Sequence, residues 1–479
     1  MTVAGHVGCY PVPMTRSSNT RVAIVGGGIT GLATASWLAA DHGIDDVVVV
    51  EASSRPGGKI RSETDRGHVL EWGPQGFLDN SPDTTELAEL AGLAEDVVQA
   101  DDAAAARFIV RNGRLRPVPT SPPAFITSDI LPLAGRLRLL AEPFARGPGG
   151  PDETVFDFAR RRIGRRAAEV LVDAMVTGIF AGDSRQLALA ATFPKMAAME
   201  AEHGSLSRAL VAKVREARRR GERSSGPAGP GGRLTSFRRG MWQLPESLGS
   251  SLGDRLLLGT RVDALRRDGE RFILTMGDER VTADAVLLAT PAEVSARLLE
   301  TLAPSAVDPL IGIPSVPIAV VMTAYRDAEA FGHPVDGFGF LVPGVEKLGI
   351  LGTLYCHDIF KAHAPEGGLF LRTMIGGARD PGALDLDDSG LVDRTRVALQ
   401  RVLGGDPDPD GVWVVRWAEG ISQYTVGHLD RVRAAEAAAA AVDVELAGSP
   451  YRGVSVNDCI KQARAAARRL AGRVGSESA

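Results

Sequence analysis

The first apolar segment of the chain is a short β-branched run followed by a glycine-rich turn. The run covers residues 22–25 and the turn reads Gly-Gly-Gly-Ile-Thr-Gly over residues 26–31. Apolar residues then recur at helical spacing over residues 32–39, and a second all-apolar run at 47–50 ends at Glu51. The pattern predicts two parallel strands joined by a helix, with the glycine turn before the helix and an acid after the second strand.

This order of strand, glycine turn, helix, strand and acid is typical of a dinucleotide-binding unit. Gly26 would make the tight turn, Gly28 would let the backbone approach a pyrophosphate, and Gly31 would let helix and strand pack closely. The helix N-terminus offers free N–H groups to phosphates, and Glu51 is placed to accept hydrogen bonds from ribose hydroxyls. An ordinary glycine-rich turn is the alternative, because the glycine pattern alone is a weak signal.

A second glycine turn, Arg55-Pro56-Gly57-Gly58-Lys59, follows Glu51 closely. An NAD dehydrogenase does not need a second glycine turn at this position. The run resembles the RxGG element of the flavin amine oxidase superfamily, and the resemblance implies that Arg55 and the glycine backbone hold the pyrophosphate and ribityl chain of FAD. The alternative is an ordinary turn from strand to loop.

The middle of the chain changes character and reads as insertions into the nucleotide-binding domain. Residues 108–110 and 115–118 flank a turn and predict a hairpin. Helical patterns cover residues 137–144, 155–162 and 167–174. The segment 218–232, rich in Arg, Gly, Ser and Pro, predicts a surface loop, with its charges solvated and not bound to nucleic acid.

Strand patterns dominate the later part of the chain. Residues 285–289 predict a buried strand that rejoins the first sheet, and the segments between 304 and 417 predict a mixed sheet on the substrate side. The other strand predictions are 255–258, 261–265, a hairpin at 272–276 and 279–282, and segments at 318–325, 339–342, 369–375 and 413–417.

Composition narrows the class of protein. With 479 residues, 44% hydrophobic and 24% charged, the chain fits a soluble protein of two to four domains. A net charge of −5 provides no global positive field for nucleic acid. Three distant cysteines indicate a reducing compartment, so we expect a cytoplasmic protein. Residues 1–19 lack a signal-peptide pattern and predict a disordered extension, within which Met14 is an alternative start.

Several sequence blocks resemble the oxygen-dependent porphyrinogen oxidases, the protoporphyrinogen or coproporphyrinogen oxidase family of haem synthesis. The resemblance runs from Arg21 to about Arg468, and its blocks lie at 71–77, 106–110 with 115–119, 177–183 with 191–194, 339–343 and 451–460. It implies an α/β (α+β composite) fold, with a Rossmann-like FAD-binding domain, a mixed-sheet substrate domain and a helical insertion able to rest on a membrane. The expected segments are 20–90, 235–302 and 418–475 for FAD, 100–120 and 303–417 for substrate, 121–216 for the insertion and 217–234 for a flexible loop.

The resemblance implies a six-electron oxidation of a porphyrinogen in three two-electron steps, with FAD passing each electron pair to dioxygen and releasing hydrogen peroxide. The bacterial branch of the family favours coproporphyrinogen III as substrate, with protoporphyrinogen IX as the alternative. Expected associations are transient contact with a ferrochelatase, peripheral contact with the inner face of the cell membrane, and a monomer or homodimer. We expect no nucleic-acid partner and no metal site.

The resemblance also assigns site residues. Arg107 would pair with a propionate, Gly178 would offer backbone to the pyrrole nitrogens, and Leu341 and Leu354 would face the ring. Met374 stands where plant relatives have a stacking Phe. A solvated strand arginine is the alternative for Arg107, and core packing is the alternative for Leu341, Leu354 and Met374.

Together the motifs place cofactor contacts along the whole chain. These contacts are Gly26, Gly28, Ile29, Thr30, Gly31, Glu51, Ala52, Arg55, Gly57, Gly58, Lys59, Gly73, Pro74, Val262, Thr290, Val454 and Val456. The helix near Asn457 would direct its positive end at the flavin pyrimidine ring. Cys459 at this helix start reads as a packed residue in preference to a nucleophile. Arg239 departs from the family, which has a glycine there.

Other function classes remain open at this point. The chain could be an FAD amine oxidase or a carotenoid-type desaturase, although five Trp and five Tyr supply an aromatic cage poorly. It could also be an FAD-binding partner protein without turnover. No constellation for a side-chain general base stands out, so we expect the chemistry to occur at the flavin.

Overall fold

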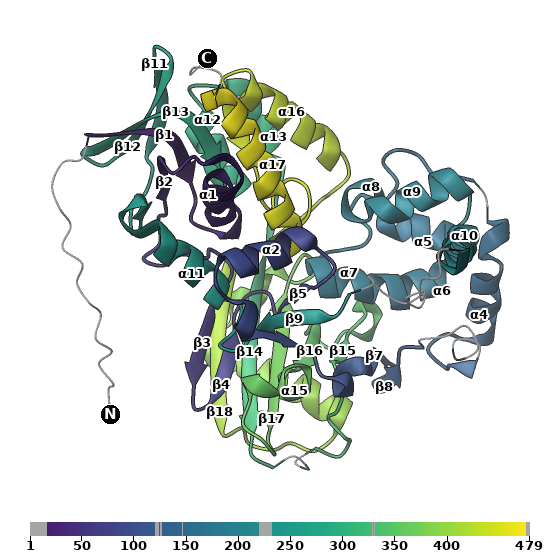
Figure 1. Cartoon of the computed structure of the whole chain (residues 1–479). Helices are drawn as coiled ribbons and strands as arrows, with labels where there is room; N and C mark the ends of the chain where they lie inside the picture. The colour runs from purple at the N-terminus through teal and green to yellow at the C-terminus, as the bar shows by residue number, and fades with distance from the viewer. Residues whose placement is uncertain are drawn as a thin grey trace.

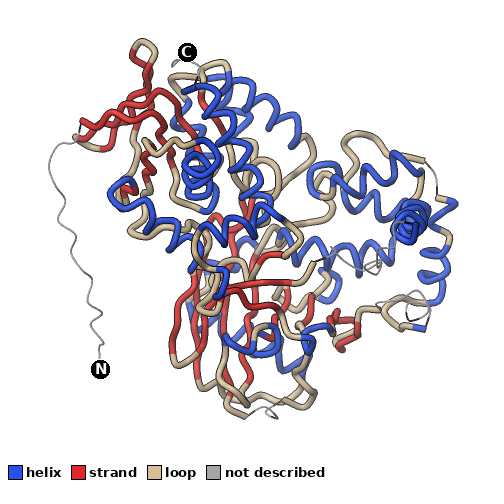
Figure 2. Tube along the Cα trace, in the orientation of Figure 1, coloured by secondary structure: helices blue, strands red, loops and turns tan. Residues whose placement is uncertain are grey.

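Two large sheets and a separate group of helices make up the computed structural model (Figures 1 and 2), which describes residues 17–119, 124, 127–145, 147–219, 232–327, 329 and 331–475. The first sheet lies at the top of Figure 1 and the second below it, with the helical group to the right. None of the helices in these residues has the length and apolarity that crossing a bilayer requires.

The first sheet has the strand order β10-β2-β1-β13-β12-β11, with β19 beside β13. Its parallel strands β10, β2, β1, β13 and β19 end at the same edge. The strands are β1 (Ser17–Val25), β2 (Val47–Val50), β10 (Leu256–Leu257), β11 (Ala264–Asp268), β12 (Arg271–Met276), β13 (Glu279–Leu288) and β19 (Val444–Leu446).

Helices cover both faces of this sheet because alternate strand residues point to opposite sides. Val22 and Ile24 of β1 pack with residues of α1 (Ile29–His42), α11 (Gln243–Leu252) and α17 (Val456–Gly475). Ala23 and Val25 pack with residues of α12 (Ala292–Leu299), α13 (Val307–Ile311) and α16 (His428–Ala440). α2 (Pro82–Leu90) adds to the first group. The result is a largely parallel sheet covered by helices on both faces, in agreement with the predicted Rossmann-like fold.

The second sheet has the order β18-β14-β17-β16-β15-β7-β8 and is antiparallel except between β15 and β7. Its strands are β7 (Arg107–Arg111), β8 (Arg114–Pro117), β14 (Ser315–Tyr325), β15 (Gly339–Leu341), β16 (Gly352–Tyr355), β17 (Leu369–Gly376) and β18 (Gly411–Ser422). Residues of α15 (Asp388–Leu403) pack on one face. The other face meets β4 (His68–Glu71) and the segment after it, through Leu70 and Trp72.

Among the described residues, two short sheets connect the first and second large sheets. β3 (Ser62–Asp65) pairs with β4 (His68–Glu71), and β9 (Leu234–Phe237) pairs with both β5 (Phe77–Leu78) and β6 (Val97–Gln99). α14 (Cys356–Ile359) follows β16 directly.

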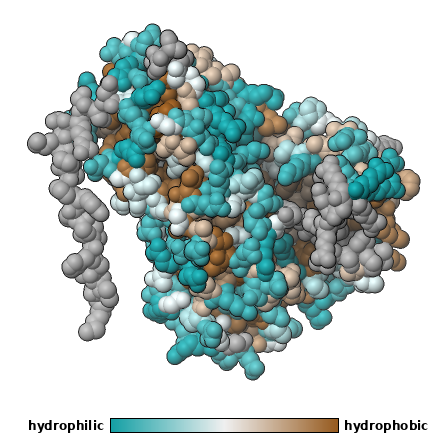
Figure 3. Space-filling view, in the orientation of Figure 1, coloured by the Kyte–Doolittle hydropathy of each residue, from teal (hydrophilic) through white to brown (hydrophobic). Residues whose placement is uncertain are grey.

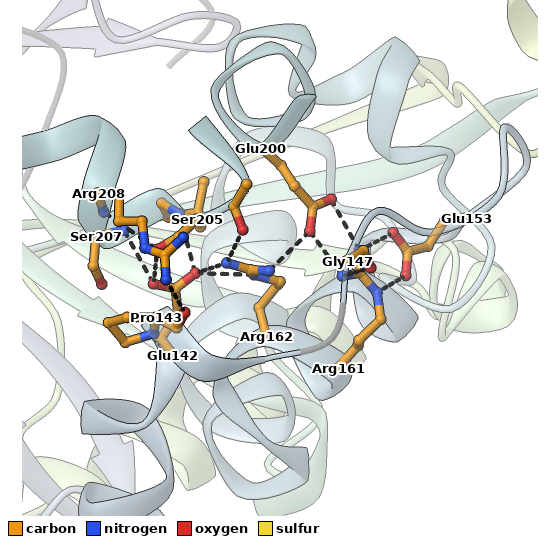
Figure 4. A network of polar contacts seen from close by, with 12 residues as sticks. Glu142, Pro143, Gly147, Glu153, Arg161, Arg162, Glu200, Ser205, Ser207 and Arg208 are labelled. Carbon is orange, nitrogen blue, oxygen red and sulfur yellow. Dashed lines mark hydrogen bonds and ion pairs between the residues drawn. The ribbon is translucent and has the colours of Figure 1, made fainter. Parts of the chain in front are cut away.

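The helical insertion contains α4 (Leu133–Leu140), α5 (Val155–Ile163), α6 (Arg165–Ala167), a π-helical turn (Ala168–Val172), α7 (Asp173–Phe180), α8 (Leu189–Thr192), α9 (Pro194–His203) and α10 (Leu206–Arg219). A network of buried ion pairs and hydrogen bonds connects the helices of this insertion (Figure 4). Arg162 is fully buried between Glu142 and Glu200, and Arg161 also pairs with Glu200 at 2.7 Å. Burial alone would raise the pKa of Glu142, but hydrogen bonds from two serines and Arg162 outweigh it and hold the pKa at about 2.

Several element boundaries differ from the sequence predictions. Residues 17–19 do not belong to a disordered extension, because their backbone pairs with β13 from Arg280 onward; residues 1–16 lie outside the described part. α10 continues to Arg219 and β9 begins at Leu234, so the predicted loop is wrong at both ends, and most of it lies outside the described residues. The segments 279–282 and 285–289 form one strand, β13. β18 extends to Ser422, beyond the expected domain boundary at 417.

Candidate functional site

Two of the three glycines of the Gly-x-Gly-x-x-Gly motif, Gly26 and Gly31, are required by close packing. Gly26 has φ +107°, and a Cβ on it would lie 2.5 Å from the Ala289 carbonyl oxygen. A Cβ on Gly31 would lie 2.0 Å from the Gly26 carbonyl oxygen and 3.1 Å from Ile24 Cγ2. A side chain at Gly26 would push the turn away from the end of β13, and one at Gly31 would push the helix away from β1.

Gly28 is different, because the protein itself does not require a glycine there. Its φ is −72°, and the nearest heavy atom to an added Cβ is Gly58 Cα at 4.0 Å. The space beside Gly28 is therefore open, at the N-terminus of α1. A free helix N-terminus with an uncovered backbone fits the pyrophosphate of a dinucleotide.

The second glycine turn lies against the first. The Gly57 amide donates to the Gly27 carbonyl at 2.8 Å, and Gly57 and Gly58 have φ +106° and +56°. The Arg55 guanidinium donates to the carbonyls of Pro56, Gly58 and Ile60 at 3.0–3.2 Å. Burial lowers the pKa of Arg55, with further lowering by Arg61. Arg55 therefore shapes the turn that would surround the cofactor.

Glu51 lies at the end of β2 beside the first turn. Its carboxylate accepts a hydrogen bond from the Gly27 amide at 2.7 Å and two more from the amide and hydroxyl of Ser53. Ala52 is exposed next to it. A carboxylate at this edge of the sheet has the acceptor chemistry that ribose hydroxyls need.

Two further predicted contacts border this edge. Val262 is buried in the core of the first sheet, and its carbonyl accepts from Arg297 at 3.1 Å. Thr290 follows β13, and its hydroxyl lies 2.7 Å from the Ser295 hydroxyl. Thr290 Cγ2 would lie 3.4 Å from a Cβ on Gly26, so the end of β13 adjoins the first turn.

A second helix N-terminus comes from the far end of the sequence. α17 begins at Val456 and is capped by Ser455, whose hydroxyl accepts from the Asp458 amide at 3.1 Å. Val454 is half-buried and Val456 is buried. Burial raises the pKa of Cys459 to about 12. The Cys459 thiol is hydrogen-bonded to the side chain of Thr30 in α1. Cys459 is therefore a packed residue, and the N-termini of α1 and α17 meet around it.

Lys59 lies in this region, and among the described residues no neighbouring group pairs with its positive charge. In the part of the chain that the structure describes, its ammonium group has no hydrogen-bond or ion-pair partner. Burial lowers its pKa, while Glu419 and Cys459 act in the opposite direction. A half-buried ammonium group without a partner fits an anionic group at this position.

Strand pairing collects four of the five predicted substrate residues on one face of the second sheet. Arg107 pairs with Gly339, which pairs with Leu354. Leu341 pairs with Gly352, which pairs with Met374. Since directly paired residues and residues two apart share a face, these side chains form two adjacent rows.

The fifth residue, Gly178 on α7, lies opposite this face. A Cβ on Gly178 would be 3.0 Å from Leu341 Cδ2. Leu341, Leu354 and Met374 are half-buried, so their apolar side chains are partly open. Arg107 is exposed over the Phe338 ring at 4.9 Å and has no ion pair among the described residues. The arrangement is an apolar surface with an unpaired cation at its rim.

The model of the family described as flavin containing amine oxidoreductase matches residues 29–471. The chain belongs to this family. It is therefore a flavin-dependent oxidoreductase, and the predicted fold class is confirmed.

Individual relatives and structures add detail to this family membership. The chain is 32% identical to a chloroplastic protoporphyrinogen oxidase of Oryza sativa subsp. japonica, over 93% of this chain and 87% of the relative. It is 34% identical to protoporphyrinogen oxidase of Bos taurus (94% and 98%) and 29% identical to coproporphyrinogen III oxidase of Bacillus subtilis (93% and 96%). A crystal structure of a putative protoporphyrinogen oxidase from Exiguobacterium matches with a TM-score of 0.80 at 25% identity, covering 96% and 99%.

An amine oxidase structure shares the fold alone. Cyclohexylamine oxidase from Brevibacterium oxydans matches with a TM-score of 0.69 at 18% identity, over 95% of this chain and 99% of that one. The fold by itself therefore does not select an amine as substrate.

One connection between the second sheet and the β3–β4 hairpin of this flavin oxidoreductase was missed by the sequence reasoning. Arg372, on the same face as Leu354 and Met374, donates to the carbonyls of Glu71 at 2.8 Å and Gly73 at 2.6 Å. Burial raises the pKa of Glu71 to about 8. The only sequence signal was a charged residue inside an otherwise apolar strand, and it does not reveal the partner.

A second connection that the sequence did not reveal holds α7 against this sheet. Asp173 accepts from Arg379 at 2.5 Å and from the Gly344 amide at 2.9 Å, and Arg379 also donates to Thr177. Because Gly178 follows Thr177, this ion pair fixes the backbone of Gly178 opposite Leu341.

The departure at Arg239 leaves the local structure intact. Gly240 has φ +94°, and a Cβ on it would lie 2.6 Å from Ser62 Cβ, so Gly240 is the position that must be glycine. The Arg239 side chain is exposed and pairs with Glu246 at 3.3 Å. A side chain at residue 239 therefore points away from the contacts that Gly240 makes.

Proposed function

We propose that the protein is an FAD-dependent porphyrinogen oxidase that converts coproporphyrinogen III to coproporphyrin III with dioxygen as acceptor. The observation that carries this proposal is the half-buried apolar face of the second sheet, with Arg107, which has no ion pair among the described residues, at its rim, and with Arg372 connecting the face to Gly73, which packs on the second glycine turn. A flat apolar macrocycle with carboxylate arms has the complementary chemistry. The names of the relatives support the same substrate class.

The residues present fit FAD at the edge of the first sheet. The open backbone at Gly28 and the N-terminus of α1 would take the pyrophosphate, and Glu51 would take the ribose hydroxyls. Lys59, the Gly73-Pro74 segment and the N-terminus of α17 would surround the ring end. When bound, FAD supplies two-electron acceptance and reoxidation by dioxygen.

The chain's own residues bind and orient the substrate. Arg107 would hold a propionate by charge-assisted hydrogen bonds. Leu341, Leu354 and Met374 would lie along the macrocycle and exclude water, with the Gly178 backbone opposite them. Removing six electrons and six protons in three steps reduces three dioxygen molecules to three hydrogen peroxide molecules.

Protoporphyrinogen IX is the second candidate substrate, and the relatives named protoporphyrinogen oxidase at 32% and 34% identity favour it. Coproporphyrinogen III carries four carboxylates in place of two, and Arg107 could pair with a propionate of either molecule. The bacterial relatives named coproporphyrinogen III oxidase support coproporphyrinogen III.

We also propose that the helical insertion contacts a membrane surface peripherally. Leu133, Leu137 and Leu140 of α4 are 64%, 58% and 50% exposed, and Phe144 beyond them is 86% exposed. The spacing of Leu133, Leu137 and Leu140 places them along one side of α4, and Phe144 lies in the 3-10 turn that follows. Apolar atoms also show at the outer edge of the insertion in Figure 3. A row of large exposed apolar side chains on an insertion suits shallow burial in a lipid interface.

A parallel assay of both porphyrinogens tests the substrate assignment. Porphyrin fluorescence is followed in air at matched concentrations, with the Gly28→Val variant as the control for uncatalysed oxidation. We expect kcat/KM for coproporphyrinogen III to exceed that for protoporphyrinogen IX. The reverse order would assign the second candidate, and turnover of neither would refute porphyrinogen oxidation.

Flotation with anionic lipid vesicles tests the membrane contact. The chain should float with the vesicles, and the triple variant L133S/L137S/F144S should remain in the dense fraction with unchanged turnover of soluble substrate. Equal flotation of both proteins would remove this surface as the contact.

A further inference from the structure

The Arg372 guanidinium is buried without a carboxylate partner. Its side chain donates to the carbonyls of Glu71 and Gly73 and lies 3.8 Å from the thioether sulfur of Met374. Among the described residues it forms no ion pair. A buried cation that meets only carbonyl oxygens and a thioether retains a large part of its field, because no opposite charge cancels it at short range.

The nearest acid does not cancel this charge either. The Glu71 carboxyl group accepts from the Met241 amide at 2.6 Å and the Ser62 hydroxyl at 2.7 Å, and among the described residues it forms no ion pair with Arg372. Burial raises the pKa of Glu71 to about 8, so the protonated form predominates at neutral pH. Burial lowers the pKa of Arg372 itself, but a guanidinium stays protonated at neutral pH, so its positive charge is retained and Glu71 does not neutralise it.

The Arg372 guanidinium lies next to the second glycine turn, separated from it by Gly73. A Cβ on Gly73, whose carbonyl accepts from Arg372, would lie 1.9 Å from the Lys59 carbonyl oxygen. Gly73 therefore packs without a gap on the turn that carries Lys59, the other cation here without a partner. Both cations border the segment assigned to the ring end of FAD.

We propose that Arg372 is a positioning residue that fixes the Gly73 segment and places a permanent positive charge beside bound FAD, favouring its singly negative two-electron-reduced form. This inference rests on the proposed FAD site. In the reduction the flavin gains two electrons and one proton from the substrate, and the substrate's second proton leaves to solvent. The resulting anion is the opposite charge that Arg372 lacks within the chain.

The test is the midpoint potential of the bound flavin, measured by spectroscopic titration of the purified holoenzyme. Arg372→Met removes the charge and keeps an apolar side chain of similar length, while Arg372→Lys keeps the charge. Arg416→Met is the matched control, since Arg416 lies on the opposite face of the same sheet and pairs with the exposed Asp388. Flavin content and thermal unfolding are recorded for each protein.

We expect Arg372→Met to shift the oxidised-to-reduced equilibrium at least tenfold toward the oxidised form, which is about 30 mV for a two-electron couple. Arg372→Lys and Arg416→Met should stay close to the wild type. If Arg372→Met loses its flavin, Arg372→Gln reconstituted with excess FAD takes its place in the same titration.

Unchanged potentials in flavin-loaded Arg372→Met or Arg372→Gln would overturn the inference and leave the proposed function standing. An equal shift in Arg416→Met would also overturn it, because the effect would then not be specific to this site. A wild-type chain that binds no flavin would instead overturn the proposed function and, with it, this inference.

Discussion

Gly178 of α7 and Leu341 of β15 bring the helical insertion into contact with the second sheet. A Cβ on Gly178 would lie 3.0 Å from Leu341 Cδ2 and 3.1 Å from Leu341 Cδ1. The two residues come from segments far apart in the sequence, and together they border the face that carries Leu354 and Met374. The missing side chain at Gly178 therefore sets how closely α7 approaches the proposed substrate surface.

Gly178→Ala should impair turnover without weakening the fold. The exchange favours the helix by about 0.5–1 kcal/mol, but the new methyl group pushes on Leu341. We expect KM for the porphyrinogen to rise severalfold while flavin content stays normal. Gly472→Ala, inside α17 with no atom within 4 Å of its Cβ, is the control. If both variants keep wild-type KM, Gly178 does not border the substrate.

Replacement by alanine should affect cofactor binding at Gly28 and stability at Gly31. Gly28→Ala introduces no clash with the protein, so the apoprotein should keep its melting temperature and lose FAD affinity. In Gly31→Ala the new Cβ would lie 2.0 Å from the Gly26 carbonyl oxygen, so this variant should lose stability, by several °C in Tm. Thermal unfolding with and without added FAD separates the two effects. A normally yellow Gly28→Ala protein would contradict the placement of the pyrophosphate.

Arg107→Ala should weaken substrate binding with the flavin site intact. Losing a charge-assisted hydrogen bond to a carboxylate costs about 1.5–3 kcal/mol, or roughly a 10- to 150-fold rise in KM. Arg114→Ala tests for a general charge effect, since Arg114 is exposed at the other end of the same hairpin. Steady-state kinetics with unchanged KM in Arg107→Ala would remove this residue from the site.

Glu71 should make stability depend on pH. Its folded pKa of about 8 lies above the ordinary value of 4.5, so its contribution is full below pH 4.5 and is lost as pH rises toward 8. The wild type should lose roughly 1.4 kcal/mol of unfolding free energy per pH unit across this window relative to Glu71→Gln. Denaturant unfolding at pH 5, 6.5 and 8 measures the difference. Glu63→Gln, in an exposed ion pair with Arg61, should run parallel to the wild type; a parallel course for Glu71→Gln would refute the buried neutral carboxyl.

The elements that local sequence determines were predictable. The turn at Gly26 and the helix after it were anticipated because a positive φ and close helix packing require glycine at fixed spacing. Residues 17–19 were misassigned to a disordered extension because they are polar, yet their backbone continues the pairing of β1 with β13. Backbone pairing of this kind leaves no side-chain pattern in the sequence.

The proposed substrate face depends on long-range strand register. The pairing of Leu341 with Gly352 and of Gly352 with Met374 decides which side chains share a face, and no local periodicity specifies it. Only the family resemblance pointed to these residues. The bonds from Arg372 to Glu71 and Gly73 join segments about 300 residues apart, so the sequence alone could not indicate them.

Anaerobic titration of the flavin-loaded protein with coproporphyrinogen III, followed by admission of air, tests porphyrinogen oxidation directly. We expect substoichiometric porphyrinogen to bleach the flavin absorbance. Air should then restore it, with three hydrogen peroxide molecules formed for each porphyrin at completion. A flavin spectrum that does not change with either coproporphyrinogen III or protoporphyrinogen IX, while an amine bleaches it, would rule out porphyrinogen oxidation.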